Sequence, residues 1–148
     1  MLLIRSAMRK GRRRSASSVE EEAGAVVQTV LEDKGYRALS DPYYLRMNGD
    51  VDVVLPMEDE NGRPVWVVVE AKVRLGLHTV ERWARRIQSS GFQARLRKHG
   101  VEGPYLAYVY GMRVDVSARK TAQKYGIGVM SSQGEQVAPK GLLQSSDK

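Results

Sequence analysis

Residues 65–75, VWVVVEAKVRL, place an acidic and a basic side chain at the end of an apolar run. The five consecutive apolar residues that open this stretch are typical of a strand buried on both faces. Ionised groups avoid such surroundings unless they are paired or bind something. Either the strand has left the core by Glu70, or Glu70 and Lys72 are placed there for chemistry.

The composition of the 148-residue chain fits one globular domain with a surplus of basic residues. The formal net charge of +7 favours a polyanionic partner. Cysteine is absent, which excludes disulfides, thiolate zinc sites and cysteine nucleophiles. The apolar start MLLI is too short for a signal-peptide core, and no apolar run approaches the roughly 20 residues that span a bilayer. We therefore expect a cytoplasmic protein that does not associate with membranes.

Hydrophobic periodicity divides the chain into a basic arm at residues 1–17, a domain at residues 18–131 and a loose C-terminal tail at residues 132–148. Within the domain the pattern predicts helices at 18–34, 78–99 and 115–126, and strands at 36–39, 49–56, 64–73, 104–111 and 127–130. This α–β–β–β–α–β–α–β order predicts an α/β fold with a central mixed sheet flanked by helices.

The two strands at 49–56 and 64–73 are expected to pair antiparallel and to bring carboxylates together. Side chains two positions apart in a strand share a face, so Glu70 and Lys72 point the same way. A pairing centred near residues 60–61 places Asp52 opposite position 68 or 70. A tight two-residue turn at 61–62 would instead pair Asp52 with Ala71 and separate the groups. Pro64 cannot donate to the ladder, which favours a longer loop and the first arrangement.

Converging carboxylates repel each other, and a bound hard divalent cation commonly compensates their charge. Oxygen ligands, with no cysteine and two histidines in the chain, indicate Mg²⁺ or Mn²⁺. Such an ion polarises a phosphate and makes a bound water more acidic. Lys72 would then orient that water, act as its base, or offset the charge that builds up on the phosphate.

The predicted helix at 78–99 has an apolar face and a basic one. Val80, Trp83, Ala84 and Ile87 are expected to face inward, and Arg82, Arg85 and Arg86 to face outward. The outward arginines are predicted to contact nucleic-acid phosphates, together with Arg12, Arg13 and Arg14 of the arm, or else to form an ordinary solvated face. Residues 89–91, Ser-Ser-Gly, break or kink this helix.

The segments GDVDVVLP (49–56) and WVVVEAK (66–72) resemble the PD-(D/E)xK nuclease superfamily, which includes restriction endonucleases and Holliday-junction resolvases. The superfamily carries an acid on one strand and Glu-x-Lys at the end of the next, and here these are Asp52 and Glu70-Ala71-Lys72. The resemblance covers roughly residues 18–131. The proline that the superfamily has just before the acid is absent, since Gly49, Asp50 and Val51 stand there.

The resemblance implies that Asp52, Glu70 and the Ala71 carbonyl hold the metal and that Lys72 activates water. The superfamily often adds a glutamate from the first helix. Glu20 lies nearest to the apolar stripe of the helix at 18–34 and is the preferred candidate for this role, and the alternative is that the acids there only stabilise the helix dipole.

The sequence thus predicts a metal-dependent endonuclease that hydrolyses DNA phosphodiester bonds, with RNA as a second substrate class. One alternative is a non-catalytic nucleic-acid-binding or interaction module with the same fold, and another is a surface salt bridge in an unrelated α/β domain. Cutting both strands of a duplex requires two sites, and the apolar start of the chain lacks an obvious internal partner. We therefore expect a homodimer to which residues 1–8 contribute.

Overall fold

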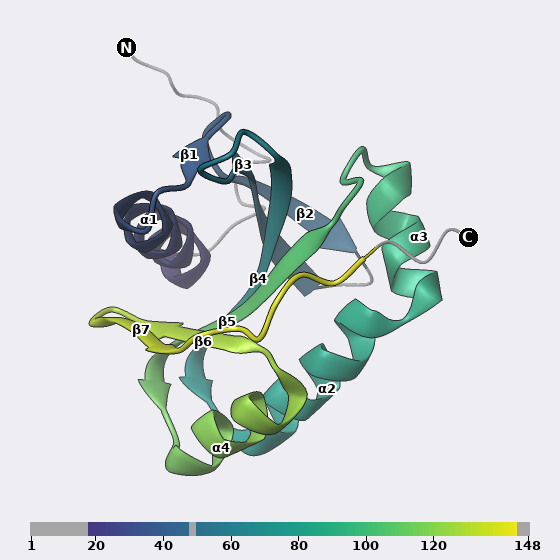
Figure 1. The fold of residues 1–148 in the computed structure, drawn as a ribbon. Helices are drawn as coiled ribbons and strands as arrows, with labels where there is room; N and C mark the ends of the chain where they lie inside the picture. The colour runs from purple at the N-terminus through teal and green to yellow at the C-terminus, as the bar shows by residue number, and fades with distance from the viewer. Residues whose placement is uncertain (1–17, 48–49, 145–148) are drawn as a thin grey trace.

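The computed structural model describes residues 18–47 and 50–144, and the strands among them form one mixed seven-stranded sheet (Figure 1). The elements are, in chain order, α1 (Ser18–Asp33), β1 (Arg37–Ala38), β2 (Tyr43–Met47), β3 (Asp50–Glu58), β4 (Pro64–Leu75), α2 (Leu77–Gln88), α3 (Ser90–Lys98), β5 (Tyr105–Val114), α4 (Val116–Tyr125), β6 (Gly128–Ser131) and β7 (Gly134–Val137). The predicted α/β fold, with a mixed sheet flanked by helices, is confirmed.

The sheet order is β1-β3-β4-β5-β6-β7, and β2 also pairs with β3. Strand β3 pairs antiparallel with β1, β2 and β4, whereas β4–β5 and β5–β6 are parallel. Parallel neighbours require a crossover, which α2 and α3 supply before β5 and α4 supplies before β6. The apolar run at 65–69 therefore lies in the middle of the sheet, as its composition predicts.

The predicted hairpin between β3 and β4 is confirmed, and its register pairs Asp52 with Glu70. The turn contains five residues, 59–63, and is not the tight two-residue alternative. One Asp59 carboxylate oxygen, Oδ1, accepts hydrogen bonds from the backbone N–H groups of Asn61 and Arg63 at 2.9 and 3.0 Å. This turn fixes the parity that keeps Asp52 and Glu70 on one face of the sheet.

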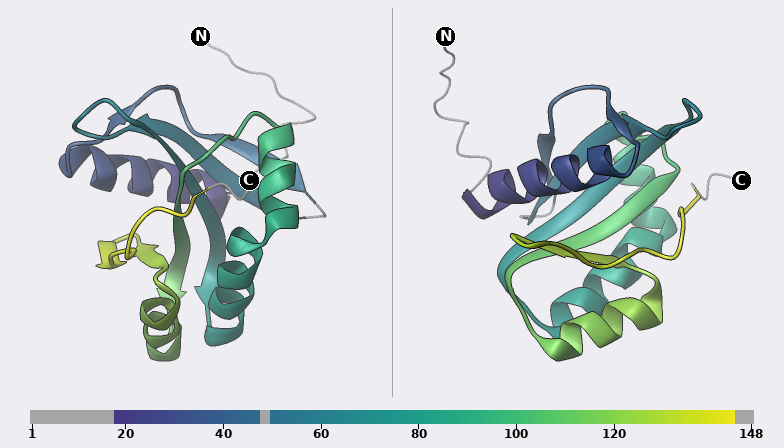
Figure 2. Two further views of the ribbon diagram at one scale, coloured as in Figure 1. Left: turned by 45° about the vertical axis from the view of Figure 1, so that its right-hand side comes forward. Right: turned by 60° about the vertical axis from the view of Figure 1, so that its left-hand side comes forward.

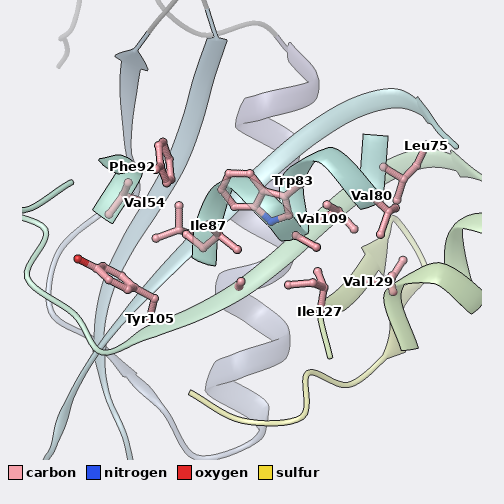
Figure 3. Close-up of a cluster of buried hydrophobic side chains, with 14 of the residues drawn as sticks. Val54, Leu75, Val80, Trp83, Ile87, Phe92, Tyr105, Val109, Ile127 and Val129 are labelled. Carbon is pink, nitrogen blue, oxygen red and sulfur yellow. The ribbon is translucent and has the colours of Figure 1, made fainter. Parts of the chain in front are cut away.

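Helix α1 covers one face of the sheet, and α2, α3 and α4 cover the other (Figures 1 and 2). Odd-numbered residues of β3 and β4, such as Val53 and Val67, pack with the α1 side, while even-numbered ones such as Val54 and Val68 pack with the other. Figure 3 shows this second core, in which Trp83 and Ile87 of α2 lie among side chains from the strands.

The helix predicted at 78–99 is broken at the residues where the sequence indicated a break or kink, and the region forms two helices, α2 and α3. Ser89 has extended backbone angles, ends α2 and begins α3. Its hydroxyl accepts a hydrogen bond from the Phe92 N–H at 3.2 Å and donates one to the Arg86 carbonyl at 2.9 Å. A serine that satisfies backbone groups of both helices favours the break over a continuous helix.

The prediction of a loose tail is wrong for part of residues 132–148. Residues 134–137 form β7, which pairs antiparallel with β6, and Leu143 exchanges backbone hydrogen bonds of 2.7 and 2.8 Å with Tyr105. Strand β2 was likewise not predicted. Both strands pair with a neighbour that carries the apolar pattern, so their own side chains need not show it.

Residues 1–17 lie outside the described residues, and with them the predicted basic arm, its Arg12, Arg13 and Arg14, and the apolar start assigned to a dimer. Within residues 18–47 and 50–144, no helix combines the length and the apolar character needed to cross a membrane.

Candidate functional site

Asp52 and Glu70 form a pair of buried carboxylates at the point where β3 and β4 stop pairing. They are direct partners in the last pair of the antiparallel ladder, while β4 continues alongside β5 to Leu75. Asp52 is fully buried and Glu70 is nearly so. Because both are even-numbered, they point to the face covered by α2. Two acids are thus held side by side in a largely apolar setting.

The guanidinium of Arg86, on α2, lies against this pair. Its Nη2 is 2.7 Å from Asp52 Oδ1 and 3.9 Å from Glu70 Oε1, and its Nη1 is 3.0 Å from Asp50 Oδ2. One cation therefore faces three carboxylates. Asp50, two positions before Asp52 on β3, is tied to the site through Arg86.

Arg86 does not face outward as predicted. Its side chain is 21% exposed, and its guanidinium carbon lies 5.0 Å from the ring centre of Trp83 and 4.7 Å from that of Phe92. Arg86 follows Trp83 by three positions on α2, so it lies at the flank of the apolar stripe and reaches the sheet. Its long aliphatic stem and flat cationic head suit contact with aromatic rings.

Lys72 lies on the same face as Glu70, as predicted from their spacing. Its Nζ is 3.7 Å from Glu70 Oε2, and its side chain is 38% exposed. Glu70 thus has Arg86 nearest to one oxygen and Lys72 nearest to the other. The exposed side of the site is where Lys72 meets solvent, so a ligand would approach there.

Burial sets the protonation of the two acids. Desolvation raises the pKa of Asp52 to about 7, although the positive charge of Arg86 works against this rise. Burial also raises the pKa of Glu70, and the charges of Arg86, Lys72 and Arg82 oppose it. Ionising the two carboxyl groups therefore costs free energy, and the nearby cations reduce that cost.

The two oxygens of Asp52 have different surroundings. Oδ1 accepts the hydrogen bond from Arg86, whereas Oδ2 is buried and receives none from any described residue. A buried carboxylate oxygen without a donor is unfavourable unless a proton or a cation satisfies it. Oδ2 therefore offers a position at which a cation could be held.

The structure does not bring Glu20 to this pair. Glu20 belongs to α1, on the opposite face of the sheet, where its charge and that of Glu21 add to the effect of burial in raising the pKa of Tyr44. No group of three acidic or histidine side chains in the described part of the chain is arranged to hold a metal ion. Among the described residues, a metal at Asp52 and Glu70 would find these two carboxylates and no third.

The other predicted phosphate ligands on α2 lie on its exposed face. Arg82 and Arg85 are both exposed, and Arg85 pairs with Glu81 at 3.4 Å. Arg82 is close enough to lower the pKa of Glu70, so its charge acts at the site from the solvent side. Further along, α3 carries three more basic residues: Arg95, Arg97 and Lys98.

Comparisons with known proteins give little overlap in sequence. No protein-family model matches the chain, and no curated protein matches it. Among solved structures, the chain is similar to one described as "Structure of EndoMS in apo form", with 18% sequence identity and a TM-score of 0.45. The match covers 84% of this chain and 48% of that one, so the chain spans about half the length of that protein.

Proposed function

We propose that the protein is a metal-dependent nuclease that hydrolyses phosphodiester bonds in DNA, with RNA as the second candidate substrate. One observation carries the proposal: Asp52 and Glu70 are paired in register, buried and on one face with Lys72, at the place where β3 and β4 separate. Carboxylates that are buried side by side, with an ammonium group at the open side, are suited to binding a cation and an anion together.

The residues present fit Mg²⁺ or Mn²⁺. Mg²⁺ is commonly held by one or two carboxylates together with waters and substrate phosphates, so a third acidic ligand is not required. Asp52 Oδ2, for which the described residues supply no donor, and the Glu70 carboxylate would hold the ion, and the Ala71 carbonyl is the third proposed ligand. When bound, the ion would polarise a phosphate and make a bound water more acidic.

The residues around the pair have separate tasks in this proposal. Lys72, half-exposed and 3.7 Å from Glu70, is placed to hydrogen-bond a water or a phosphate oxygen, which offsets charge that develops on the phosphate. Arg82 and Arg85 lie exposed on α2 and would hold the phosphates that flank the cleaved one. Contacts with phosphates position the nucleic-acid backbone but do not recognise the base sequence.

A cleavage assay tests the proposal. Purified protein is incubated with plasmid, single-stranded and branched DNA and with RNA, in the presence of Mg²⁺ or of EDTA. We expect cleavage of at least one substrate that needs Mg²⁺ and that falls at least 100-fold in Asp52→Ala and in Lys72→Ala. Lys120→Ala, which removes an exposed lysine of α4, is the control and should cleave like the wild type. Cleavage that persists in EDTA and in Lys72→Ala would rule the mechanism out.

A non-catalytic nucleic-acid-binding module is the second candidate, and Arg86 favours it. The guanidinium already gives Asp52 and Asp50 an internal cation, so the carboxylates have a counter-ion without any metal. Both candidates predict DNA binding that weakens as salt rises. Calorimetric titration with Mn²⁺ separates them, since only the nuclease requires an ion that Asp52→Ala no longer binds.

A further inference from the structure

Arg86 occupies the position between the two carboxylates that the proposed metal would share. Its Nη2 lies 2.7 Å from an Asp52 oxygen and 3.9 Å from a Glu70 oxygen. A Mg²⁺ or Mn²⁺ ion bound by both groups would lie about 2 Å from an oxygen of each. The two cations would then be only a few ångströms apart.

Cations at that separation repel strongly where water is scarce, because screening is weak in a buried site. The Arg86 side chain is 21% exposed, lies against the Trp83 and Phe92 rings and contacts Asp52 directly, so little water reaches the contact. Asp52 Oδ2 is the oxygen at which an ion would bind first, since it is buried and no described group donates a hydrogen bond to it. Full binding by both carboxylates then requires Nη2 to move away from Asp52.

The guanidinium has a position to move to. Its Nη1 is bound at 3.0 Å to Asp50, whose side chain is 47% exposed, so a swing about this contact leads toward solvent. Arg86 Nε is buried and finds no acceptor among the residues of the described chain, so the present position leaves one donor unsatisfied. On the open side, however, Lys72 and Arg82 are also positive. A third cation is stable there only beside an anion, and a phosphate of the substrate is such an anion.

We propose that Arg86 is exchanged between two partners: it neutralises Asp52 and Glu70 when no metal is bound, and it binds a substrate phosphate when a divalent cation takes its place. The inference rests on the proposed function, and it adds a residue that couples metal binding to nucleic-acid binding. Arg86 therefore weakens metal binding in the free protein, and nucleic acid relieves this effect by binding Arg86. By reciprocity, the metal strengthens nucleic-acid binding by the same factor.

The first test measures Mn²⁺ affinity without nucleic acid, from the electron paramagnetic resonance signal of free Mn²⁺. We expect Arg86→Met to bind Mn²⁺ at least tenfold more tightly than the wild type, and Arg86→Lys, which keeps the charge, to stay within threefold of it. Arg37→Met is the matched control, because it removes an arginine that pairs with another β3 carboxylate, Glu58, at the far end of the strand. If Arg86→Met does not fold, Arg86→Gln replaces it as the neutral variant.

The second test measures the affinity for a short DNA duplex with phosphorothioate linkages, by fluorescence anisotropy, with and without Mn²⁺. We expect Mn²⁺ to tighten binding by a factor at least three times larger in the wild type than in Arg86→Met. Equal factors would overturn the exchange onto phosphate.

The outcomes separate this inference from the proposed function. Equal Mn²⁺ affinity in the wild type, Arg86→Met and Arg86→Lys would overturn the exchange and leave the metal site standing. Weaker binding in Arg86→Met would also overturn the exchange, because Arg86 would then only support the ligands. Absence of Mn²⁺ binding in all of these proteins would overturn the proposed function, and the exchange with it.

Discussion

Asp52 combines two conditions that rarely occur in one side chain. It is fully buried, and yet it has a cation on one oxygen and no donor from the described residues on the other. A single ion pair rarely repays the cost of burying a charge. Burial therefore dominates, and the pKa of Asp52 rises to about 7 in spite of Arg86. The site is under electrostatic stress that a divalent cation or a proton can relieve.

This stress predicts how stability depends on pH. The pKa of Asp52 is about 7 in the folded protein and about 3.9 in an unfolded chain, so between these values the folded state binds a proton that the unfolded state does not. The free energy of unfolding should therefore fall as pH rises from about 4 to about 7 and level off above that range. Glu70, whose pKa is also raised by burial, acts in the same direction.

Urea unfolding in EDTA across this pH range measures the effect. Asp52→Asn, which cannot titrate, should show a clearly smaller slope of unfolding free energy against pH. Asp41→Asn, at an exposed position in the turn before β2, should keep the wild-type slope. The assigned cause is wrong if the Asp52→Asn slope equals that of the wild type.

At the residue scale, strand periodicity predicted more than helix periodicity did. The i, i+2 rule places Glu70 and Lys72 on one face wherever the strand lies, and five residues in the turn then fix Asp52 opposite Glu70. Helix periodicity alone could not predict that the Arg86 side chain turns inward. It lies at the flank of the α2 stripe, and a flank residue turns inward only when the neighbouring sheet offers it a partner. The predicted carboxylates, Asp52 and Glu70, were such partners. They could have indicated that Arg86, three positions after Trp83, turns inward.

The path of β6 beside β5 depends on a glycine. Gly128 is the parallel partner of Tyr108, and a Cβ added at position 128 would lie 2.4 Å from a Tyr108 ring carbon and 3.0 Å from Pro139 Cδ. The ring cannot easily move, because it is buried and its hydroxyl donates a hydrogen bond to Glu135 at 2.7 Å. The close approach of β6 to this ring therefore requires a residue without a side chain.

We expect Gly128→Ala to lower the free energy of unfolding by about 1–3 kcal/mol, the usual cost of overpacking a rigid core. Gly91→Ala is the matched control. Gly91 lies in α3, and an added Cβ there would meet no atom of the described chain within 4 Å. That variant should be unchanged or more stable by up to about 1 kcal/mol, since alanine favours a helix. Equal losses in both variants, measured by urea unfolding, would refute the packing argument.

At the element scale, the strands with apolar patterns were predictable and the strands without them were not. Strands β3, β4, β5 and β6 lie between neighbours and carry the apolar runs that define them. β2 and β7 each have a single buried residue, Met47 and Val137, and the other residues of these strands are half-buried or exposed. These strands form because the neighbouring strand has an edge with which they can pair. The hydrophobic pattern of the segment itself does not show whether such an edge is present.

The two sides of the whole molecule differ in charge. α1 carries five acidic residues and no basic one: Glu20, Glu21, Glu22, Glu32 and Asp33. α2 and α3 carry six basic residues against a single acid, Glu81. Asp52, Glu70 and Lys72 lie on the α2 side. A polyanion is thus attracted to the face that holds the candidate site and repelled from the other.

This asymmetry predicts a directional, salt-dependent interaction with nucleic acid. Arg82 is exposed on α2 and its charge acts at Glu70, so Arg82→Gln should weaken DNA binding, with the slope of log affinity against log salt smaller by about one. Arg63→Gln removes the same charge in the turn at the opposite end of β3 and β4, and its slope should match the wild type. Fluorescence anisotropy over a salt series in EDTA measures both. If the two substitutions lower the slope equally, binding follows net charge alone, and the basic face does not direct the polyanion to Asp52 and Glu70.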